Sequence, residues 1–262
     1  MIKTCKNLYS NICIFKFKRV LFIFLLLILI PIFFAAIDFK YSTKINDSFY
    51  IYYLFLVTNI ANVPFTIITS LVFTIILLFI YKSNLKNMII LSIFVNLVVL
   101  SSQSIVYFTK NIVKEPRPYV DLLVENNYIN NSDEFYLLDK NKRIEFIESI
   151  NLKDINIPSW QQKYFTKEIG YSFPSGHTVF IATWTILLFC LLIAKRRYFL
   201  AFCIYCLAFF IEVSRLLLGM HFWHDIFISC CISFFTVLFF VWVINIFKVI
   251  RKKKFNFLHK FL

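Results

Sequence analysis

Long apolar stretches, separated by short polar or basic segments, dominate this chain. A helix that crosses a bilayer needs about 20 mostly apolar residues, and six stretches of the sequence come close to that length. They are Val20 to Ile37, Phe65 to Tyr81, Met88 to Phe108, Thr178 to Ala194, Phe199 to Leu218 and Ile226 to Phe247. The pattern therefore predicts an all-α integral membrane protein with six transmembrane helices.

The apolar residues that lead into the second stretch already begin at Phe49, which makes the run too long for one ordinary crossing. Pro64 interrupts the run, and proline tends to end or kink a helix because it lacks an amide donor. We therefore expect a helix break there, preceded by an interfacial segment over Tyr50 to Val57 whose tyrosines lie at headgroup level. The first stretch is longer than the core of a signal peptide, so we expect it to be retained.

One long polar segment, residues 111–173, separates the third and fourth stretches. We interpret residues 1–262 as a single membrane-embedded domain in which this segment is a small, mainly helical insertion. Asn131 and Glu134 have the spacing of a helix-capping box. Aromatic residues of the segment, such as Tyr164, are expected to rest on the bilayer surface, with contact to an acyl or prenyl chain as the alternative.

The distribution of charge predicts how the chain is oriented in the membrane. Only 16% of the residues are charged, yet the net charge is +14. The basic residues gather before the first stretch, between the second and third, between the fourth and fifth and after the sixth, and none of these segments contains an acidic residue. By the positive-inside rule both termini are predicted to be cytoplasmic and residues 111–173 to lie outside. Division of the charge among membrane flanks argues against a nucleic-acid partner, although the basic tail is expected to touch anionic lipid.

Three polar fragments interrupt the second half of the chain. They are Lys110 with Arg117 and Pro118, then Pro174, Ser175, Gly176 and His177, and finally Ser214, Arg215, His221 and Asp225. With the predicted orientation, every fragment lies at the outer end of a helix. Charge counting did not use these residues, so their common side independently supports one site on the outer face.

The residue types in these fragments suit a phosphate group. Arg117 and Arg215 can make forked contacts to phosphoryl oxygens, Lys110 supplies a point charge and Ser175 a hydroxyl. Gly176 allows the backbone to come close at a helix N-terminus, where free amides favour an anion. Charged residues at helix ends are often only interfacial anchors, so it is the complete set that predicts a phosphate-binding site.

Two histidines add the chemistry. His221 and Asp225 are four residues apart and share one helix face, so the carboxylate can fix the imidazole tautomer and leave the other nitrogen free to attack phosphorus. His177 is placed to act as a general acid and base. No metal is needed in this scheme, and neither histidine has cysteine or carboxylate neighbours at the spacing of a zinc site.

These motifs, with VKEPRPYV at Val113 to Val120, DEFY at Asp133 to Tyr136, GYSFPSGHT at Gly170 to Thr178 and SRLLLGMH at Ser214 to His221, carry a resemblance. Over residues 88–240 or thereabouts, the chain resembles the type 2 phosphatidic acid phosphatase (PAP2) superfamily, and within it the bacterial phosphatidylglycerophosphatase B enzymes. Every motif position of that family is filled.

The resemblance implies a membrane lipid-phosphate phosphatase without a cofactor, in which His221 becomes a phosphohistidine, Asp225 orients it and His177 is the acid and base. Implied substrates are undecaprenyl diphosphate, phosphatidylglycerol phosphate and phosphatidic acid. The implied location is the bacterial inner membrane with the site facing the periplasm. Bilayer lipids are the expected partners, and no obligate protein partner is evident.

Two alternatives stay open at this point. A lipid A phosphatase or phosphotransferase of the same superfamily would share all three motifs, and only substrate assays separate the two. A non-catalytic lipid-binding or transport protein would be expected to have lost a catalytic residue, and its spans would carry paired charges or broken helices.

One acidic residue within a predicted span, two histidines and the cysteines are not among the residues of the three polar fragments. Glu212 lies inside the fifth stretch, and we predict that it pairs with Arg215 as a supporting residue of the site, with packing against a polar neighbour as the alternative. His224 is interpreted as a rim residue, and His259 as a residue without a role in the site. The cysteines lie in predicted spans or cytoplasmic segments, where disulfides are not expected.

Overall fold

The computed structural model describes residues 15–46 and 48–258, with side chains described as far as Ile246. Seven of the helices in this part are α2 (Phe17–Ala36), α3 (Phe49–Thr58), α4 (Phe65–Tyr81), α5 (Leu85–Val113), α10 (Gly176–Ala194), α11 (Tyr198–Leu217) and α12 (Trp223–Leu258). Shorter ones are α6 (Pro118–Glu125), α7 (Ser132–Leu137), α8 (Lys140–Ser149), α9 (Ser159–Phe165) and the 3₁₀ turns η1 (Thr43–Ile45), η2 (Asn59–Ala61) and η3 (Leu152–Ile155). The described part contains no strand, so the predicted all-α class is confirmed there.

The number of spans agrees with the prediction. Five helices are long and apolar enough to cross a membrane, and a sixth span arises when the bent pair Phe49–Ala61 and Phe65–Tyr81 is counted as one. The two members of that pair meet at 73°, and Pro64 lies at the break. The predicted interruption at this proline is therefore confirmed.

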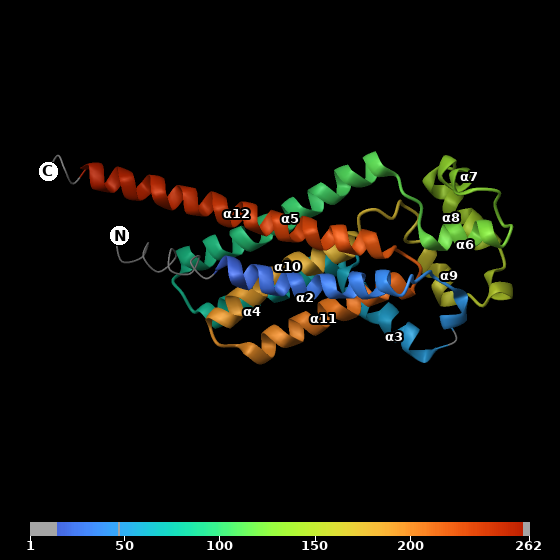
Figure 1. Ribbon diagram of the computed structural model, residues 1–262, viewed down its shortest axis with the longest axis horizontal. Helices are drawn as coiled ribbons and strands as arrows, with labels where there is room; N and C mark the ends of the chain where they lie inside the picture. Colours follow the sequence, from blue (N-terminus) through green and yellow to red (C-terminus); the bar gives the residue numbers. More distant parts are fainter. Residues whose placement is uncertain (1–14, 47, 259–262) are drawn as a thin grey trace.

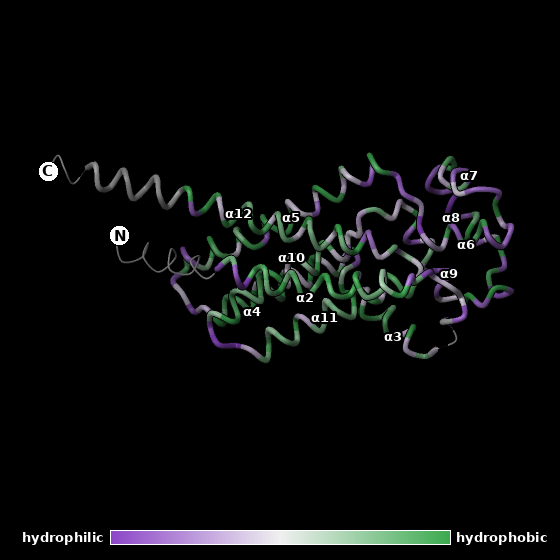
Figure 2. The backbone as a smooth tube through the Cα atoms, viewed as in Figure 1, coloured by the Kyte–Doolittle hydropathy of each residue, from purple (hydrophilic) through white to green (hydrophobic). Residues whose placement is uncertain are grey.

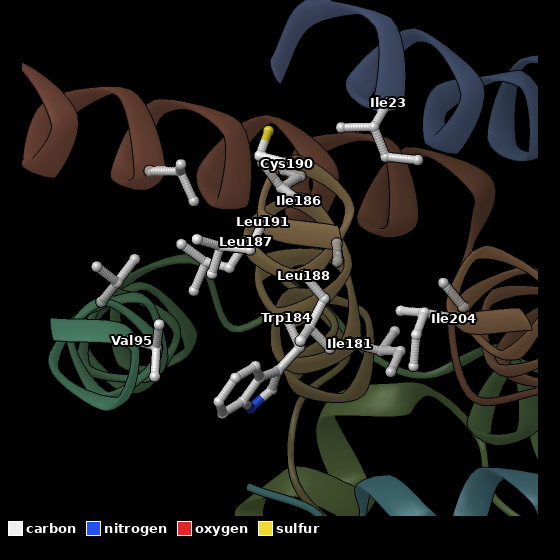
Figure 3. Packing of buried hydrophobic residues seen from close by; sticks show 14 of the residues in the cluster. Ile23, Val95, Ile181, Trp184, Ile186, Leu187, Leu188, Cys190, Leu191 and Ile204 are labelled. Carbon is white, nitrogen blue, oxygen red and sulfur yellow. The ribbon is translucent and has the colours of Figure 1, made fainter. Parts of the chain in front are cut away.

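Helix α10 lies at the centre of the bundle. In its apolar window 83% of the residues are buried, compared with 28–44% in the other single-helix spans. Figure 3 shows Ile181, Trp184, Leu187 and Leu188 projecting from α10 toward the surrounding helices. The Trp184 indole donates a hydrogen bond to Ser70 Oγ of α4 at 3.2 Å, which anchors α10 beyond apolar contact alone. This packing fixes the position of the α10 N-terminus, where His177 lies.

The two ends of the molecule differ. Figure 1 shows α6, α7, α8 and α9 gathered at one end, while the connections α4–α5 and α10–α11 lie at the other. In Figure 2 the hydrophilic residues concentrate at these ends and the hydrophobic ones along the long helices between them. We call residues 114–173 the cap. Helix α5 runs to Val113, so the cap begins three residues later than the predicted insertion.

The cap has a hydrophobic core of its own. Tyr119 and Phe165 stack with ring centroids 4.3 Å apart, and Phe135 and Ile147 are fully buried beside them. Phe165 and Tyr164 are only 0% and 1% exposed, so the expectation that such aromatic residues rest on the bilayer surface is wrong for these two. Packing among the short helices buries them instead, which gives the cap a defined shape above the ends of the long helices.

One helix terminus and one contact of the cap can be compared with the sequence predictions. Asn131 Oδ1 accepts a hydrogen bond from the Glu134 amide at 2.9 Å, as the capping pattern predicts. The α3 residue Phe55 packs against Trp160 and Tyr164 of the cap, at ring distances of 5.1 and 5.0 Å. The segment that was predicted to be interfacial therefore joins the cap to the bundle.

Candidate active site

The turn that ends α11 brings Arg215 and His221 together. Gly219 has φ +72, and a Cβ atom there would lie 2.6 Å from the Tyr41 ring, so both conformation and space require glycine. Beyond this turn the amides of Met220 and His221 both donate to the Arg215 carbonyl at 3.1 Å. The backbone thus ties the two functional residues to each other before α12 begins.

His221 and Asp225 form the expected pair. His221 Nδ1 and Asp225 Oδ2 are 3.1 Å apart, and the Phe222 amide donates to the same oxygen at 3.0 Å. Burial lowers the pKa of His221 well below its usual value, and the nearby cations Arg117 and Arg215 lower it further. The imidazole is therefore neutral, with Nδ1 engaged by the carboxylate and Nε2 left as the nitrogen available for bond formation.

All three nitrogen atoms of the Arg117 guanidinium donate hydrogen bonds. Nε donates to the Gly170 carbonyl at 2.7 Å, Nη1 to the Met220 carbonyl at 3.1 Å and Nη2 to Glu168 Oε2 at 2.7 Å. The first contact holds the chain just before the PSGH segment, and the second holds the residue just before His221. One arginine therefore positions two of the three sequence fragments.

Arg215 is fully buried yet only partly satisfied. Nη1 donates to the Tyr164 hydroxyl of the cap and to Thr58 Oγ1. Nη2 lies 3.3 Å from Glu168 Oε1, but neither Nη2 nor Nε makes a hydrogen bond within the described part of the chain. A buried guanidinium with donors to spare is suited to a ligand that offers more acceptor oxygens than a carboxylate does.

Glu168 occupies the centre of this arrangement, although no motif in the sequence predicted it. Its carboxylate bridges Arg117 and Arg215 and lies 3.7 Å from His177 Nε2. Burial would raise the pKa of Glu168, but Arg215 and Arg117 outweigh that effect and hold its pKa below the usual range. The ionised carboxylate therefore marks an anion-binding position formed by two arginines and a histidine.

His177 lies on the first turn of α10, facing that position. Its Nε2 is buried and has no hydrogen-bond partner in the described structure. Ser175 caps the helix, because its hydroxyl accepts a hydrogen bond from the Thr178 amide at 3.3 Å. The Ser175 amide in turn donates to Ser229 Oγ of α12 at 2.9 Å. These contacts fix the helix terminus against α12.

Gly176 follows as the first residue of α10. A Cβ atom at this position would meet only Val106 Cγ1 at 3.7 Å and Gln103 Oε1 at 3.9 Å, which are ordinary contacts. Packing inside the chain therefore does not demand glycine here. Close approach of a ligand to the helix N-terminus remains a reason for its presence.

Lys110, at the end of α5, donates from Nζ to the Tyr171 carbonyl at 2.7 Å. It thereby helps Arg117 to hold the segment that leads into Pro174. Among the described residues Glu168 forms ion pairs with Arg117, Arg215 and His177 but not with Lys110, so the Lys110 ammonium lies at the edge of the anion-binding position. All eight residues that the sequence placed in the site do lie at the same end of the bundle, as the elements labelled in Figure 1 indicate.

The predicted pairing of Glu212 with Arg215 is wrong. Glu212 Oε1 accepts a weak hydrogen bond from Cys230 Sγ of α12 at 3.6 Å, and Oε2 has no partner in the described part. Arg215 instead pairs with Glu168 of the cap. A spacing of three residues allows contact on a helix but does not dictate it. The alternative, packing against a polar neighbour, describes Glu212.

His224 belongs to a second cluster at the edge of the site. Its Nε2 lies 2.7 Å from Glu115 Oε1 and 3.6 Å from Asp225 Oδ1. The side chain of His224 is 38% exposed, in keeping with a rim position. The three ligand atoms lie within 4.8 Å of one another, a grouping that could hold a metal ion. Sequence spacing did not reveal it, because Glu115 is far from His224 along the chain. His259 lies outside the described residues.

Comparison with known proteins shows the family of this chain. Residues 89–248 match the PAP2 superfamily. The chain belongs to that superfamily, as its motifs predicted. It is 31% identical over 244 residues to phosphatidylglycerophosphatase B of Haemophilus influenzae, covering 90% of this chain and 97% of that protein. It is 32% identical over 189 residues to the protein of the same name in Escherichia coli K12, covering 72% and 74% of the two chains. This PAP2 member is thus a membrane phosphatase and a hydrolase.

Proposed function

We propose that this PAP2 member removes phosphate from undecaprenyl diphosphate, phosphatidylglycerol phosphate or phosphatidic acid in the bacterial inner membrane. One observation carries the proposal: Arg117, Arg215 and His177 surround a buried anion position, and the oriented His221–Asp225 pair lies beside it. The name of the Haemophilus influenzae relative supports a phosphatidylglycerol phosphate substrate.

The reaction proceeds in two displacements. His221 Nε2 attacks the terminal phosphorus, so that a P–N bond forms while the P–O bond to the lipid breaks. His177 donates a proton to the departing oxygen, and Asp225 stabilises the positive charge that develops on the His221 ring. In the second step His177 accepts a proton from water, whose oxygen attacks phosphorus and breaks the P–N bond. Inorganic phosphate leaves and both histidines return to their first state.

The arginines stabilise charge through both steps. Phosphoryl oxygens carry distributed negative charge in the transition state, and fixed donors in a site that excludes water stabilise it strongly. The unsatisfied Nε and Nη2 of Arg215 supply donors that the Glu168 carboxylate does not use. Glu168 gives up its place to the phosphate group, because its carboxylate lies between Arg117 and Arg215 and would repel a second anion held there.

A lipid has a route to this position from the side. A cavity of about 550 Å³ lies between α4, α5 and α10 and is lined at its inner end by Gly176 and His177. Its outer walls carry apolar residues such as Ile67 and Leu100, and both of these side chains are exposed on the surface of the bundle. The arrangement suits a substrate whose chain lies among lipids while its phosphate reaches the histidines.

We infer that the cap and the site face the periplasm and that both termini are cytoplasmic. The acid-free basic connections at Lys82–Lys86 and Lys195–Arg197 lie at the end opposite the cap, and such connections favour the cytoplasmic side. An outward site would act on lipid phosphates of the outer leaflet, which fits recycling of the undecaprenyl carrier.

Phosphate release by purified protein tests the proposal. The panel contains undecaprenyl diphosphate, phosphatidylglycerol phosphate, phosphatidic acid and lipid A, each in detergent micelles. We expect release from at least one of the first three, loss of release in His221→Ala and normal release in the control His259→Ala. Full turnover by a folded His221→Ala variant would refute the nucleophile, and release from lipid A alone would favour the lipid A phosphatase alternative.

A further inference from the structure

The two oxygens of the Asp225 carboxylate have different surroundings. Oδ2 accepts the contacts that orient His221, from the His221 ring and from the Phe222 amide. Oδ1 is buried and has no hydrogen-bond partner at bonding distance in the described part of the chain; the Ser172 hydroxyl approaches the carboxylate only loosely. His224 Nε2 lies 3.6 Å from Oδ1, which is too long for a hydrogen bond. A buried carboxylate oxygen without a partner calls for a ligand or an explanation.

Glu115 completes a cluster around that oxygen. Its Oε1 lies 2.7 Å from His224 Nε2, and the ligand atoms of the three residues lie within 4.8 Å of one another. The residues come from two elements, since Glu115 follows α5 while His224 and Asp225 lie on the first turn of α12. The Glu115 carbonyl accepts a hydrogen bond from the Ser172 amide at 2.8 Å, which fixes this segment in the cap.

The imidazole of the cluster is also held in place. The His224 ring stacks on Phe222, with centroids 5.3 Å apart and planes inclined by 9°. This leaves Nε2 directed at the two carboxylates. The His224 and Glu115 side chains are 38% and 26% exposed, whereas the Asp225 side chain is fully buried. A cation could therefore enter from the solvent side and reach the buried oxygen last.

A hydrogen bond between Glu115 and a protonated His224 would be the simplest account of these contacts. It satisfies those two residues but leaves Asp225 Oδ1 without a partner. A cation bound by all three ligands satisfies the third as well. The donor set is one imidazole nitrogen and two carboxylate oxygens, which zinc accepts readily, with a water molecule in the fourth position. Calcium and magnesium prefer oxygen ligands alone.

We propose that Glu115, His224 and Asp225 form a binding site for a zinc-class divalent cation, and that occupancy of this site slows phosphate hydrolysis. The site is distinct from the anion position, and the cation takes no part in the metal-free reaction described above. Its effect passes through Asp225. A cation on Oδ1 withdraws negative charge from the carboxylate, so that Oδ2 stabilises the positively charged phosphohistidine less well.

Zinc binding to the chelator-treated full-length protein tests the site. Isothermal titration with zinc chloride in detergent, without substrate, is expected to give one ion per chain with a micromolar Kd. Glu115→Gln and His224→Gln should each weaken binding by about tenfold or more, since each removes one ligand. His259→Gln is the matched control, because His259 is not one of the three proposed ligands, and it should bind zinc as the wild-type protein does.

Hydrolysis in the same preparations tests the consequence. Zinc should lower the rate of the wild-type protein and of His259→Gln, EDTA should restore it, and Glu115→Gln should resist the zinc concentration that halves the wild-type rate. The ratio of rates with and without zinc is taken within each folded variant, so a lower basal rate does not obscure the result. Equal binding in all variants, or binding that leaves the rate unchanged, would overturn the proposal. Since binding is measured without substrate, failure here leaves the proposed phosphatase reaction untouched.

Discussion

At the scale of single residues, the position of Glu168 explains most about the site. Its carboxylate contacts Arg117 and Arg215 and approaches His177, so it occupies the place that the proposed reaction assigns to phosphate. A tethered carboxylate offers two oxygens, whereas a phosphate group offers more, and the spare donors of Arg215 favour the exchange. Anion binding is therefore a competition between the substrate and a residue of the cap.

Glu168→Gln should bind orthovanadate or inorganic phosphate about tenfold more tightly than the wild-type protein, because a neutral amide competes less well for two arginines. Isothermal titration with orthovanadate measures this. Glu148→Gln, which changes an exposed glutamate of α8, is the control and should bind as the wild type does. Unchanged affinity in Glu168→Gln would mean that the carboxylate does not occupy the phosphate position.

Sequence reasoning could identify some of these residues and not others. His221, Asp225 and the arginines were predictable because their spacing within motifs reports their geometry. Glu168 and Glu115 were not, because each reaches the site through folding of the cap, and a single glutamate in a polar segment has no distinguishing neighbours. The pairing of Glu212 with Arg215 was predicted wrongly, because a spacing of three residues on a helix permits a contact but does not determine the side-chain rotamers.

At the scale of elements, α10 links the core to the chemistry. Its apolar face is buried among the other long helices, while its N-terminus carries Ser175, Gly176 and His177. Hydrophobic patterning predicted the long helices to within a few residues, apart from the ends of α5 and α12, since apolar length alone defines them. The cap was harder to predict, because the burial of its aromatic residues depends on contacts between short helices.

The cavity beside α10 yields a prediction about lipid binding. Thr66→Trp partly fills the cavity between α4, α5 and α10, because Thr66 is one of its lining residues. If the added ring costs substrate binding about 1–3 kcal/mol, the magnitude typical of a steric misfit, kcat/KM for undecaprenyl diphosphate should fall by roughly fivefold to a hundredfold. Hydrolysis of a short water-soluble phosphate ester should change little. Comparison of the two substrates is the measurement.

Ile68→Trp is the matched control for that variant. Ile68 lies two residues further along α4, is 53% exposed and is not among the residues that line the cavity. It should leave both activities near those of the wild-type protein. Equal losses for the long and short substrates in Thr66→Trp would indicate distortion of the site rather than obstruction of a lipid path.

At the scale of the whole molecule, the bundle separates two chemically different ends. Basic connections lie at one and the cap with the site at the other (Figures 1 and 2). The motifs and the positive charges are independent features of the sequence. The charges nevertheless place all the motif residues at one end of the bundle, as a common site requires. That agreement is the basis of the proposed periplasmic orientation, which can be measured directly.

Cysteine labelling in spheroplasts tests the orientation. Leu137→Cys in the cap exposes a thiol to the solvent, since Leu137 is 85% exposed. Leu85→Cys does the same at the opposite end, where Leu85 is 73% exposed. A membrane-impermeant maleimide should label the first variant in spheroplasts and the second only after lysis, above the background of the wild-type protein. The reverse pattern would invert the proposed topology.

Acid stability reports on the ion pairs that join the cap to the bundle. The folded-state pKa of Glu168 is lower than its usual value near 4.5. Its stabilising effect is therefore complete above pH 4.5 and is lost as the pH falls below that value toward the folded-state pKa. The difference in Tm between the wild-type protein and Glu168→Gln should shrink over that acidic range. A difference that stays constant from neutral to acidic pH would show that Glu168 is not ionised in the folded protein.

The most direct test of the central claim is detection of a phosphoenzyme. Brief reaction with a lipid labelled in its terminal phosphate, followed by an alkaline quench and peptide mass spectrometry, locates the label. We expect it on His221 in the wild-type protein and none in His221→Ala. Label on any other residue, or undiminished label in His221→Ala, would contradict the account.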